Sequence, residues 1–272
     1  MSLKDSIKKI PIVYPVLSYI KNEVFLPIKS GHMRFFVYFI LFIMYDETKA
    51  LKSRGFKNIH IFMPFTWRIG KGRDYAFRRY YTACLNGIKV FIKIGKNDST
   101  VVNEAKIYNY IGKEKFNFLA NAVFIDHNFA DDTVMIANEF IEGLDSVEKI
   151  SQKSDFENIC QAFLIALDEL EKLEIIHADI HKGNIMYAQN KGLYLLDFGI
   201  SFIKGKEKTV NYSARPGTFY INDLQNKQRK YDDAYSFTRM IECLKFPEEW
   251  LQTEAYIKIT ERIGNFSDVV EL

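Results

Sequence analysis

The sequence predicts an α+β fold, and three observations support this prediction. Two polar motifs, at 177–184 and 195–199, are separated by a predicted strand, turn and second strand. Upstream of them, an apolar run at 90–94 is followed by apolar residues at helical spacing over 101–111. The chain of 272 residues is 48% hydrophobic and 15% aromatic, which is enough to bury a full core.

The two central motifs place polar groups at a fixed spacing. The first reads His-Ala-Asp-Ile-His-Lys-Gly-Asn at 177–184, and the second reads Leu-Leu-Asp-Phe-Gly at 195–199. Asp179 is suited to orient an attacking hydroxyl, whereas Asn184 and Asp197 offer oxygen ligands of the kind that Mg²⁺ prefers. The hairpin expected between the motifs would bring these groups together. The sequence therefore predicts a phosphoryl-transfer site.

Together, the two motifs make the chain resemble the protein-kinase-like superfamily. The H-x-D-x-x-x-x-N loop and the D-F-G stand at the separation that this superfamily requires. The resemblance implies a two-lobe fold with a shortened C-terminal lobe, ATP as substrate, and Mg²⁺ or Mn²⁺ as metal. It divides the chain into an N-terminal extension (1–60), a small lobe (61–143) and a large lobe (144–272).

The elements of the predicted small lobe follow in order along the chain. A strand at 77–84, an Asn-Gly turn at 86–87 and a strand at 90–94 predict a β-hairpin. The helix at 101–111 is expected to begin at an N-cap Ser or Thr at 99–100. A hairpin followed by a helix is the order that the resemblance implies for this lobe.

Lys93 ends a Val-Phe-Ile-Lys pattern, and the resemblance implies that it contacts the α- and β-phosphates of ATP. Glu104, on the predicted helix, is its expected ion-pair partner. The separation between these two residues is shorter than in most protein kinases, which leaves Glu114 as an alternative partner. The expected catalytic residues are therefore Lys93, Asp179, Asn184 and Asp197.

Two further segments complete the predicted nucleotide site. Gly70 and Gly72 precede Lys93 at the distance of a glycine-rich loop over the phosphates, although Tyr75 stands where a third glycine is usual. After the last predicted strand of the small lobe, backbone groups around Glu139 and Ile141 are expected to meet the edge of the adenine. The match to the glycine-rich loop is thus partial.

Two segments after the D-F-G resemble parts of a kinase large lobe. Gly-Thr-Phe-Tyr at 217–220 is similar to the end of an activation segment, and Asp233 opens a segment similar to the start of the central helix. The resemblance implies that Asp233 supports the backbone of the catalytic loop and that His177 packs beneath the D-F-G. No A-P-E motif follows, and the sequence stops before the helices with which protein kinases bind peptides.

The catalytic loop departs from the protein-kinase pattern at two positions. Ala178 replaces the usual Arg, which removes the docking site for a phosphorylated activation segment. His181 stands where serine/threonine kinases carry Lys, and Asp-x-His-x-Gly-Asn is similar to aminoglycoside phosphotransferases, UbiB-type atypical kinases and lipopolysaccharide core heptose kinases. We therefore expect a sugar hydroxyl of a surface glycolipid or polysaccharide as acceptor, as in lipopolysaccharide biosynthesis. A minimal protein serine/threonine kinase and a nucleotide-binding pseudokinase are the alternatives.

Composition limits the partners and the compartment. A net charge of +3 is too small to favour nucleic acid as a partner. Cys84, Cys160 and Cys243 are widely spaced and odd in number, so neither a disulfide framework nor a zinc site is indicated. We therefore expect a cytoplasmic protein.

The first 45 residues differ in character from the rest. They carry six basic residues against Asp5 and Glu23, and an uncharged apolar run occupies 35–44. This run is well short of the roughly 20 residues that a membrane-spanning helix needs. Two interpretations stay open for residues 1–45: peripheral contact with the inner face of the membrane, or a helix packed on the small lobe.

Overall fold

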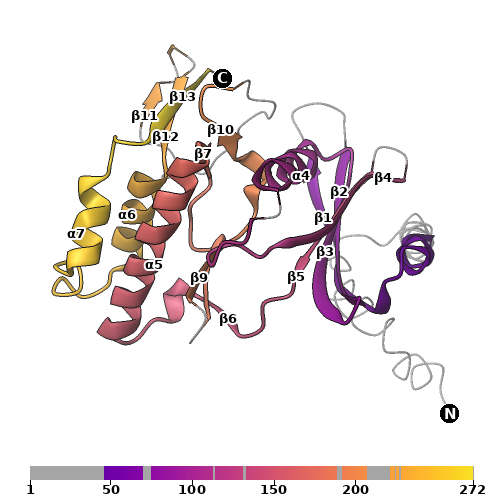
Figure 1. The fold of residues 1–272 in the computed structure, drawn as a ribbon. Coiled ribbons are helices and arrows are strands. Elements are labelled where there is room, and N and C mark those ends of the chain that lie inside the picture. Colours follow the sequence, from indigo (N-terminus) through magenta and orange to yellow (C-terminus); the bar gives the residue numbers. More distant parts are fainter. Residues whose placement is uncertain are drawn as a thin grey trace, which may run out of the picture.

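The computed structural model describes most of the chain beyond its first 45 residues. The described residues are 46–69, 75–112, 114–130, 133–188, 192–206, 221–223, 225–226 and 228–271. Figure 1 shows two lobes, one built on a β-sheet and the other mainly helical. The predicted α+β two-lobe fold is therefore confirmed. The segment at 1–45, the glycine loop with Gly70 and Gly72, and the segment at 217–220 lie outside the described residues.

Five antiparallel strands form the sheet of the small lobe. In spatial order they are β1 (Lys57–Ile69), β2 (Tyr75–Leu85), β3 (Ile88–Lys96), β5 (Thr133–Glu139) and β4 (Ala122–Ala130). Asn86 and Gly87 close the β2–β3 hairpin with φ angles of 50° and 83°, the positive values that an Asn-Gly turn favours. Residues 46–53 are helical, and Leu51 and Phe56 pack into the core of the sheet. The small lobe therefore includes residues before 61, where its boundary was expected.

Helix α4 (Ser99–Ile111) lies between the sheet and the large lobe (Figure 1). Its N-cap is Asp98, not Ser99 or Thr100 as expected. The Asp98 carboxylate accepts hydrogen bonds from the backbone N–H groups of Thr100 and Val101. A carboxylate also carries a full negative charge to the positive end of the helix dipole, which a hydroxyl does not.

In the part of the large lobe that the structure describes, three helices form the core: α5 (Lys153–Lys172), α6 (Asp233–Leu244) and α7 (Glu254–Glu261). Phe163 of α5 stacks on Phe237 of α6 with ring centroids 4.0 Å apart. Val101 and Ala105 of α4 belong to the same buried cluster. The helix that carries Glu104 is thus packed on the large lobe as well as on the sheet.

Among the described residues, no helix has the length and hydropathy to cross a membrane.

Short strands hold the loops of the large lobe. They form three small sheets: β6 (Leu144–Ser146), β8 (Ile185–Ala188) and β9 (Gly192–Leu195); β7 (Ile175–Ile176) and β10 (Phe202–Ile203); β11 (Ile221–Asp223), β12 (Gln228–Asp232) and β13 (Ser267–Glu271). The β8–β9 hairpin joins the two central motifs, as expected from their sequence. At its open end, Leu196 N donates to Asn184 O at 2.8 Å, so the catalytic loop and the D-F-G lie side by side.

Candidate active site

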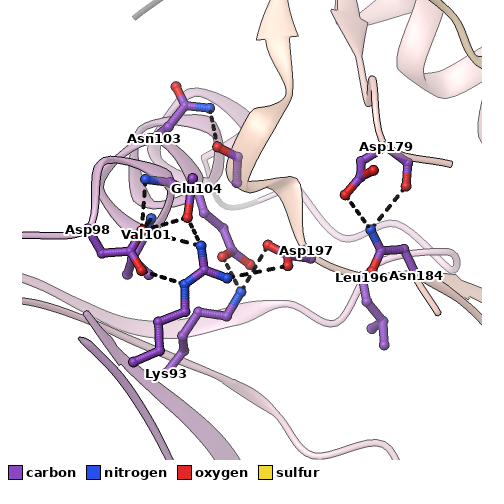
Figure 2. Close-up of polar contacts among 12 residues, drawn as sticks. Lys93, Asp98, Val101, Asn103, Glu104, Asp179, Asn184, Leu196 and Asp197 are labelled. Atoms are coloured by element: carbon purple, nitrogen blue, oxygen red, sulfur yellow. Dashed lines mark hydrogen bonds and ion pairs between the residues drawn. The ribbon is translucent and has the colours of Figure 1, made fainter. Parts of the chain in front are cut away.

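A cavity of about 610 Å³ lies between the two lobes. Its lining includes six residues expected from the sequence: Lys93, Glu104, Glu139, Ile141, Asn184 and Asp197. Asp179 does not line the cavity itself but contacts Asn184, which does. Figure 2 shows two groups of polar side chains, one around Lys93 and Asp197 and the other around Asp179 and Asn184.

Lys93 lies between two carboxylates. Its Nζ donates to Glu104 Oε2 at 2.5 Å and to Asp197 Oδ1 at 3.2 Å (Figure 2). Glu104 comes from α4, whereas Glu114 lies beyond the end of that helix with an exposed side chain. The structure therefore pairs Lys93 with Glu104, the first of the two partners considered.

This cluster holds its charges away from water. Burial alone would lower the pKa of Lys93, but the carboxylates of Asp197 and Glu104 outweigh burial and raise it. Burial raises the pKa of Glu104, and the positive charge of Lys93 opposes that rise. The ammonium of Lys93 is thus charged at neutral pH and fixed in direction before any ligand arrives.

Arg78 of β2 is a second cation in this cluster, and the sequence analysis did not identify it. Its Nε and Nη2 donate to the two carboxylate oxygens of Asp98, and its Nη1 lies 3.7 Å from Asp197 Oδ2. Tyr80 of β2 lies directly opposite Lys93 of β3. Because alternate strand residues share a face, Arg78 lies on the face of Lys93, which is the signal that could have revealed it.

The catalytic loop holds Asp179 through neutral groups. Asn184 Nδ2 donates to Asp179 O at 3.0 Å and to Asp179 Oδ2 at 3.1 Å (Figure 2). His181 Nδ1 accepts a hydrogen bond from Gly183 N at 3.0 Å, and His181 Nε2 lies 3.6 Å from Asp179 Oδ2. Since Nδ1 accepts, the proton of a neutral His181 is on Nε2, facing Asp179.

The buried carboxylate of Asp233 supports the loop from below. It accepts hydrogen bonds from His177 N at 2.7 Å and from Ala178 N at 3.0 Å. The His177 ring lies under Phe198, with centroids 4.5 Å apart. Burial raises the pKa of Asp233 to about 7, although its two backbone donors oppose the rise. Asp233 and His177 therefore occupy the supporting positions that the resemblance implied.

The D-F-G segment takes a backbone conformation that fixes the direction of Asp197. Asp197 has a φ of 62°, in the left-handed region. A Cβ added to Gly199 would lie 2.9 Å from Asp197 Oδ1 and 3.0 Å from Thr100 Cβ. Asn103 of α4 donates to Gly199 O at 3.2 Å. Only glycine leaves room at position 199 for α4 to approach this segment so closely.

Asn184 and Asp197 provide donors that suit a hard divalent cation. Because Asn184 Nδ2 donates to Asp179, the Oδ1 of Asn184 faces away from Asp179. The Asp197 side chain is 29% exposed. The described residues contain no cluster of three or more His, Cys, Asp or Glu side chains that could hold a metal. Mg²⁺ commonly uses one or two protein oxygens together with waters and substrate phosphates, so the donor set fits it.

Aromatic side chains form one part of the cavity lining. Phe91 stacks on Tyr80, with centroids 5.6 Å apart, and meets Phe62 edge to face at 5.4 Å. All three line the cavity, and Phe62 is 60% exposed. At the expected hinge, Glu139 N already donates to Asn121 O at 2.9 Å, so that amide is not available to a ligand. These rings therefore give the cavity planar apolar surface.

Comparison with known proteins supports the same superfamily. A family model described as "ABC1 atypical kinase-like domain" matches residues 122–228, which include the catalytic loop and the D-F-G. The chain is 32% identical over 130 residues to the dual specificity protein kinase zakA of Dictyostelium discoideum, covering 45% of this chain and 16% of that protein. It is 26% identical over 164 residues to the serine/threonine-protein kinase TIO of Arabidopsis thaliana, covering 59% of this chain and 12% of that protein. The chain thus spans less than a fifth of the length of either relative.

Proposed function

The chain belongs to the protein-kinase-like superfamily, and we propose that it transfers the γ-phosphoryl group of ATP to a hydroxyl. One observation carries this proposal: the Lys93, Glu104 and Asp197 cluster faces the same cavity as Asn184, which holds Asp179. A cation for the phosphates, oxygen donors for a metal and a carboxylate for the acceptor are the parts that phosphoryl transfer needs.

Each residue has a defined role in this proposal. Lys93 binds phosphate oxygens, and Glu104 holds its ammonium in place. Asn184 and Asp197 would hold Mg²⁺ or Mn²⁺, which neutralises charge on the phosphates when bound. Asp179 orients the acceptor hydroxyl and takes its proton. The acceptor oxygen bonds to the γ-phosphorus as the bond from the γ-phosphorus to the bridging oxygen breaks, and ADP leaves.

The aromatic part of the cavity lining suits the base of the nucleotide. Phe62, Tyr80 and Phe91 present ring faces and edges to the cavity, and aromatic rings stack favourably on planar bases. Backbone groups near Ile141 would meet the edge of the adenine. Gly70 and Gly72, outside the described residues, would cover the phosphates. The cavity thus offers separate surfaces to base and phosphates.

For the acceptor, we propose a sugar hydroxyl of a surface glycolipid or polysaccharide. The support is the Asp-x-His-x-Gly-Asn loop, in which His181 replaces the Lys of protein kinases and turns Nε2 toward Asp179. A protein Ser or Thr hydroxyl is the second candidate, favoured by the names of the matched relatives. Incubation of the enzyme and labelled ATP with de-phosphorylated glycolipid or with a mixed peptide library separates the two.

The placement of the protein in the cell is also a proposal. We propose a cytoplasmic protein whose basic and apolar residues 1–45 contact the inner face of the membrane. The support is the sequence alone, with six basic residues near an apolar run. Sedimentation with anionic vesicles at low salt, and release as salt is raised, is the expected result. A chain that stays in the supernatant would contradict membrane contact and move the protein acceptor ahead of the glycolipid.

Metal-dependent nucleotide binding tests the central proposal. ATP with Mg²⁺ should raise the thermal midpoint in proportion to RT ln(1 + [L]/Kd), and ATP with EDTA should raise it less. Hydrolysis of ATP, with water as the acceptor, measures turnover without knowledge of the natural acceptor. No Mg²⁺-dependent shift at millimolar ATP would contradict both an active kinase and a nucleotide-binding pseudokinase. A shift without turnover would favour the pseudokinase.

A further inference from the structure

Arg78 joins two parts of the site that come from different lobes. Its guanidinium donates to both oxygens of Asp98, the N-cap of α4, and its Nη1 lies 3.7 Å from Asp197 of the D-F-G. We infer that Arg78 is a positioning residue that fixes the metal-binding carboxylate of Asp197 relative to α4, and thereby to the pair of Lys93 and Glu104. This inference rests on the proposed function.

The register of the sheet gives Arg78 room to reach α4. On β3, the residue opposite Arg78 is Gly95. A Cβ at Gly95 would lie 2.7 Å from Val101 Cβ and 3.1 Å from Asp98 Cβ, so a side chain there would push the first turn of α4 off the sheet. Gly95 therefore lets the helix approach, and Arg78 bridges from the neighbouring strand to its N-cap.

A second contact ties α4 to the D-F-G. Asn103 Nδ2 donates to Gly199 O at 3.2 Å and to Ser201 O at 2.7 Å. These bonds hold the backbone of the segment, whereas Arg78 contacts the side chain of Asp197. Arg78 thus acts on the carboxylate that the reaction uses.

The geometry requires a guanidinium. Within this cluster, three carboxylates (Asp98, Glu104 and Asp197) face two cations, Arg78 and Lys93. The Arg78 side chain is only 4% exposed, and it uses one edge for Asp98 and another nitrogen for Asp197. A planar fork can serve two carboxylates at once, whereas an ammonium is a single point charge.

The catalytic loop shows why such a device is useful here. Ala178 stands where an Arg would accept a phosphorylated activation segment, and it is fully buried. The loop therefore cannot position the site through phosphate docking at that residue. Arg78 supplies a contact within the chain between the small lobe and Asp197.

A matched pair of variants tests the inference in the full chain. Arg79 is the next residue on β2, it is equally buried, and it pairs with Glu47 on the other face of the sheet. The ATP hydrolysis kinetics of Arg78→Gln and Arg79→Gln are compared at a temperature below the thermal midpoint of both variants. Arg78→Gln should lower kcat for ATP hydrolysis by about 10²-fold, the scale of a small misplacement at a reacting centre, with the KM for ATP within about 3-fold. Arg79→Gln should leave both constants near wild type.

Two further readouts separate positioning from mere stability. In Arg78→Gln, the extra thermal shift given by Mg²⁺ over EDTA at fixed ATP should be smaller than in wild type, and Arg78→Lys should restore less than about a tenth of the lost kcat. Without nucleotide, backbone amides at 99–111 should exchange with solvent faster in Arg78→Gln than in Arg79→Gln. The exchange result does not depend on turnover.

The outcomes are distinct. Wild-type kcat and a wild-type Mg²⁺ shift in Arg78→Gln would overturn the inference, as would an equal loss of both in Arg79→Gln. A Mg²⁺ shift that grows in Arg78→Gln would also overturn it, because Arg78 would then compete with the metal. If the wild-type chain shows no Mg²⁺ shift, the proposed function fails. Separately, amide exchange at 99–111 that is unchanged in Arg78→Gln would show that Arg78 does not fix α4.

Discussion

The two sides of the cavity are held together by different forces. On one side, Lys93 and Glu104 of the small lobe and Asp197 of the D-F-G are fixed by charge pairs, in which Lys93 and Glu104 have little exposure to water. On the catalytic-loop side, Asp179 is fixed by the neutral amide of Asn184, and the loop rests on backbone hydrogen bonds to Asp233. The first side depends on the balance of charge and the second on geometry.

This difference predicts how each side fails. Removing one charge from a buried pair leaves the other uncompensated, which costs more than the pair contributes. Removing one hydrogen bond from a neutral network loses about 1 kcal/mol, or more where a buried group is left unsatisfied. Variants of the charge-paired side should therefore affect folding and function together, whereas variants near Asp179 should affect function with little change in folding.

The largest expected effect is that of Lys93→Met. Without the ammonium, the Glu104 carboxylate, whose side chain is 3% exposed, loses its cation. Breaking a buried pair in this way typically costs about 3–5 kcal/mol of folding free energy, and ATP hydrolysis should be abolished as well. Chemical denaturation and ATP hydrolysis measure the two effects.

A double variant provides the control for this prediction. Lys93→Met with Glu104→Gln removes the uncompensated carboxylate, so much of the lost folding free energy should return while turnover stays absent. If the single and double variants unfold at the same denaturant concentration, the charge pair is not what holds this side together.

The next effect is that of Asp179→Asn, which should act on turnover alone. An Asn side chain keeps an oxygen for Asn184 Nδ2 but cannot take a proton from the acceptor. Turnover should fall by about 10²-fold or more, with the thermal shift caused by ATP and Mg²⁺ retained. Asp145→Asn, in an exposed pair with Lys149, is the control and should behave as wild type. Full activity of Asp179→Asn would show that this residue is misassigned.

A smaller effect is expected at Gly95, where α4 approaches β3. In Gly95→Ala the new Cβ would lie 2.7 Å from Val101 Cβ, and overpacking of this kind typically costs about 1–3 kcal/mol. Adding Val101→Ala removes one of the clashing atoms, Val101 Cγ2, and should recover part of both stability and turnover. If the second change makes the protein less stable still, the approach of α4 to β3 is not limited by this contact.

The sequence predicted the parts of the site that come from short, continuous segments. Asp179, Asn184 and Asp197 lie in two motifs joined by one hairpin, so their proximity follows from local strand and turn patterns. Lys93 and Glu104 lie on a strand and the helix after it, and the structure pairs them. Each of these residues belongs to a motif whose spacing limits where its side chain can lie.

The sequence did not reveal the contacts that depend on register and close approach. Arg78 reaches Asp98 because β2 pairs with β3 in one register and because Gly95 admits the helix. The same contact explains why Asp98, and not Ser99, is the N-cap of α4: the carboxylate serves the helix and the guanidinium together. Such pairings are set by tertiary packing, which local propensity does not encode.

The last expected effect is a change in pH dependence beneath the catalytic loop, where two neighbouring groups have opposite shifts. Burial lowers the pKa of His177 to about 4 and raises that of Asp233 to about 7. His177 has a folded pKa below its unfolded value of about 6.5, so its contribution to stability is lost as pH falls from about 6.5 to 4. Asp233 has a folded pKa above its unfolded value of about 4, so its contribution is lost as pH rises from about 4 to 7.

In the wild-type chain these two contributions oppose each other, and Asp233→Asn should separate them. Asn stays neutral at every pH, so the stability of wild type relative to the variant should decrease between pH 4 and 7, by at most about 1.4 kcal/mol per pH unit. The variant itself should gain stability more steeply with pH than wild type, because the contribution of His177 is no longer opposed. Thermal midpoints of both proteins in matched buffers measure this difference. A difference that grows with pH would mean that the backbone N–H groups of His177 and Ala178 stabilise the Asp233 carboxylate more than burial destabilises it.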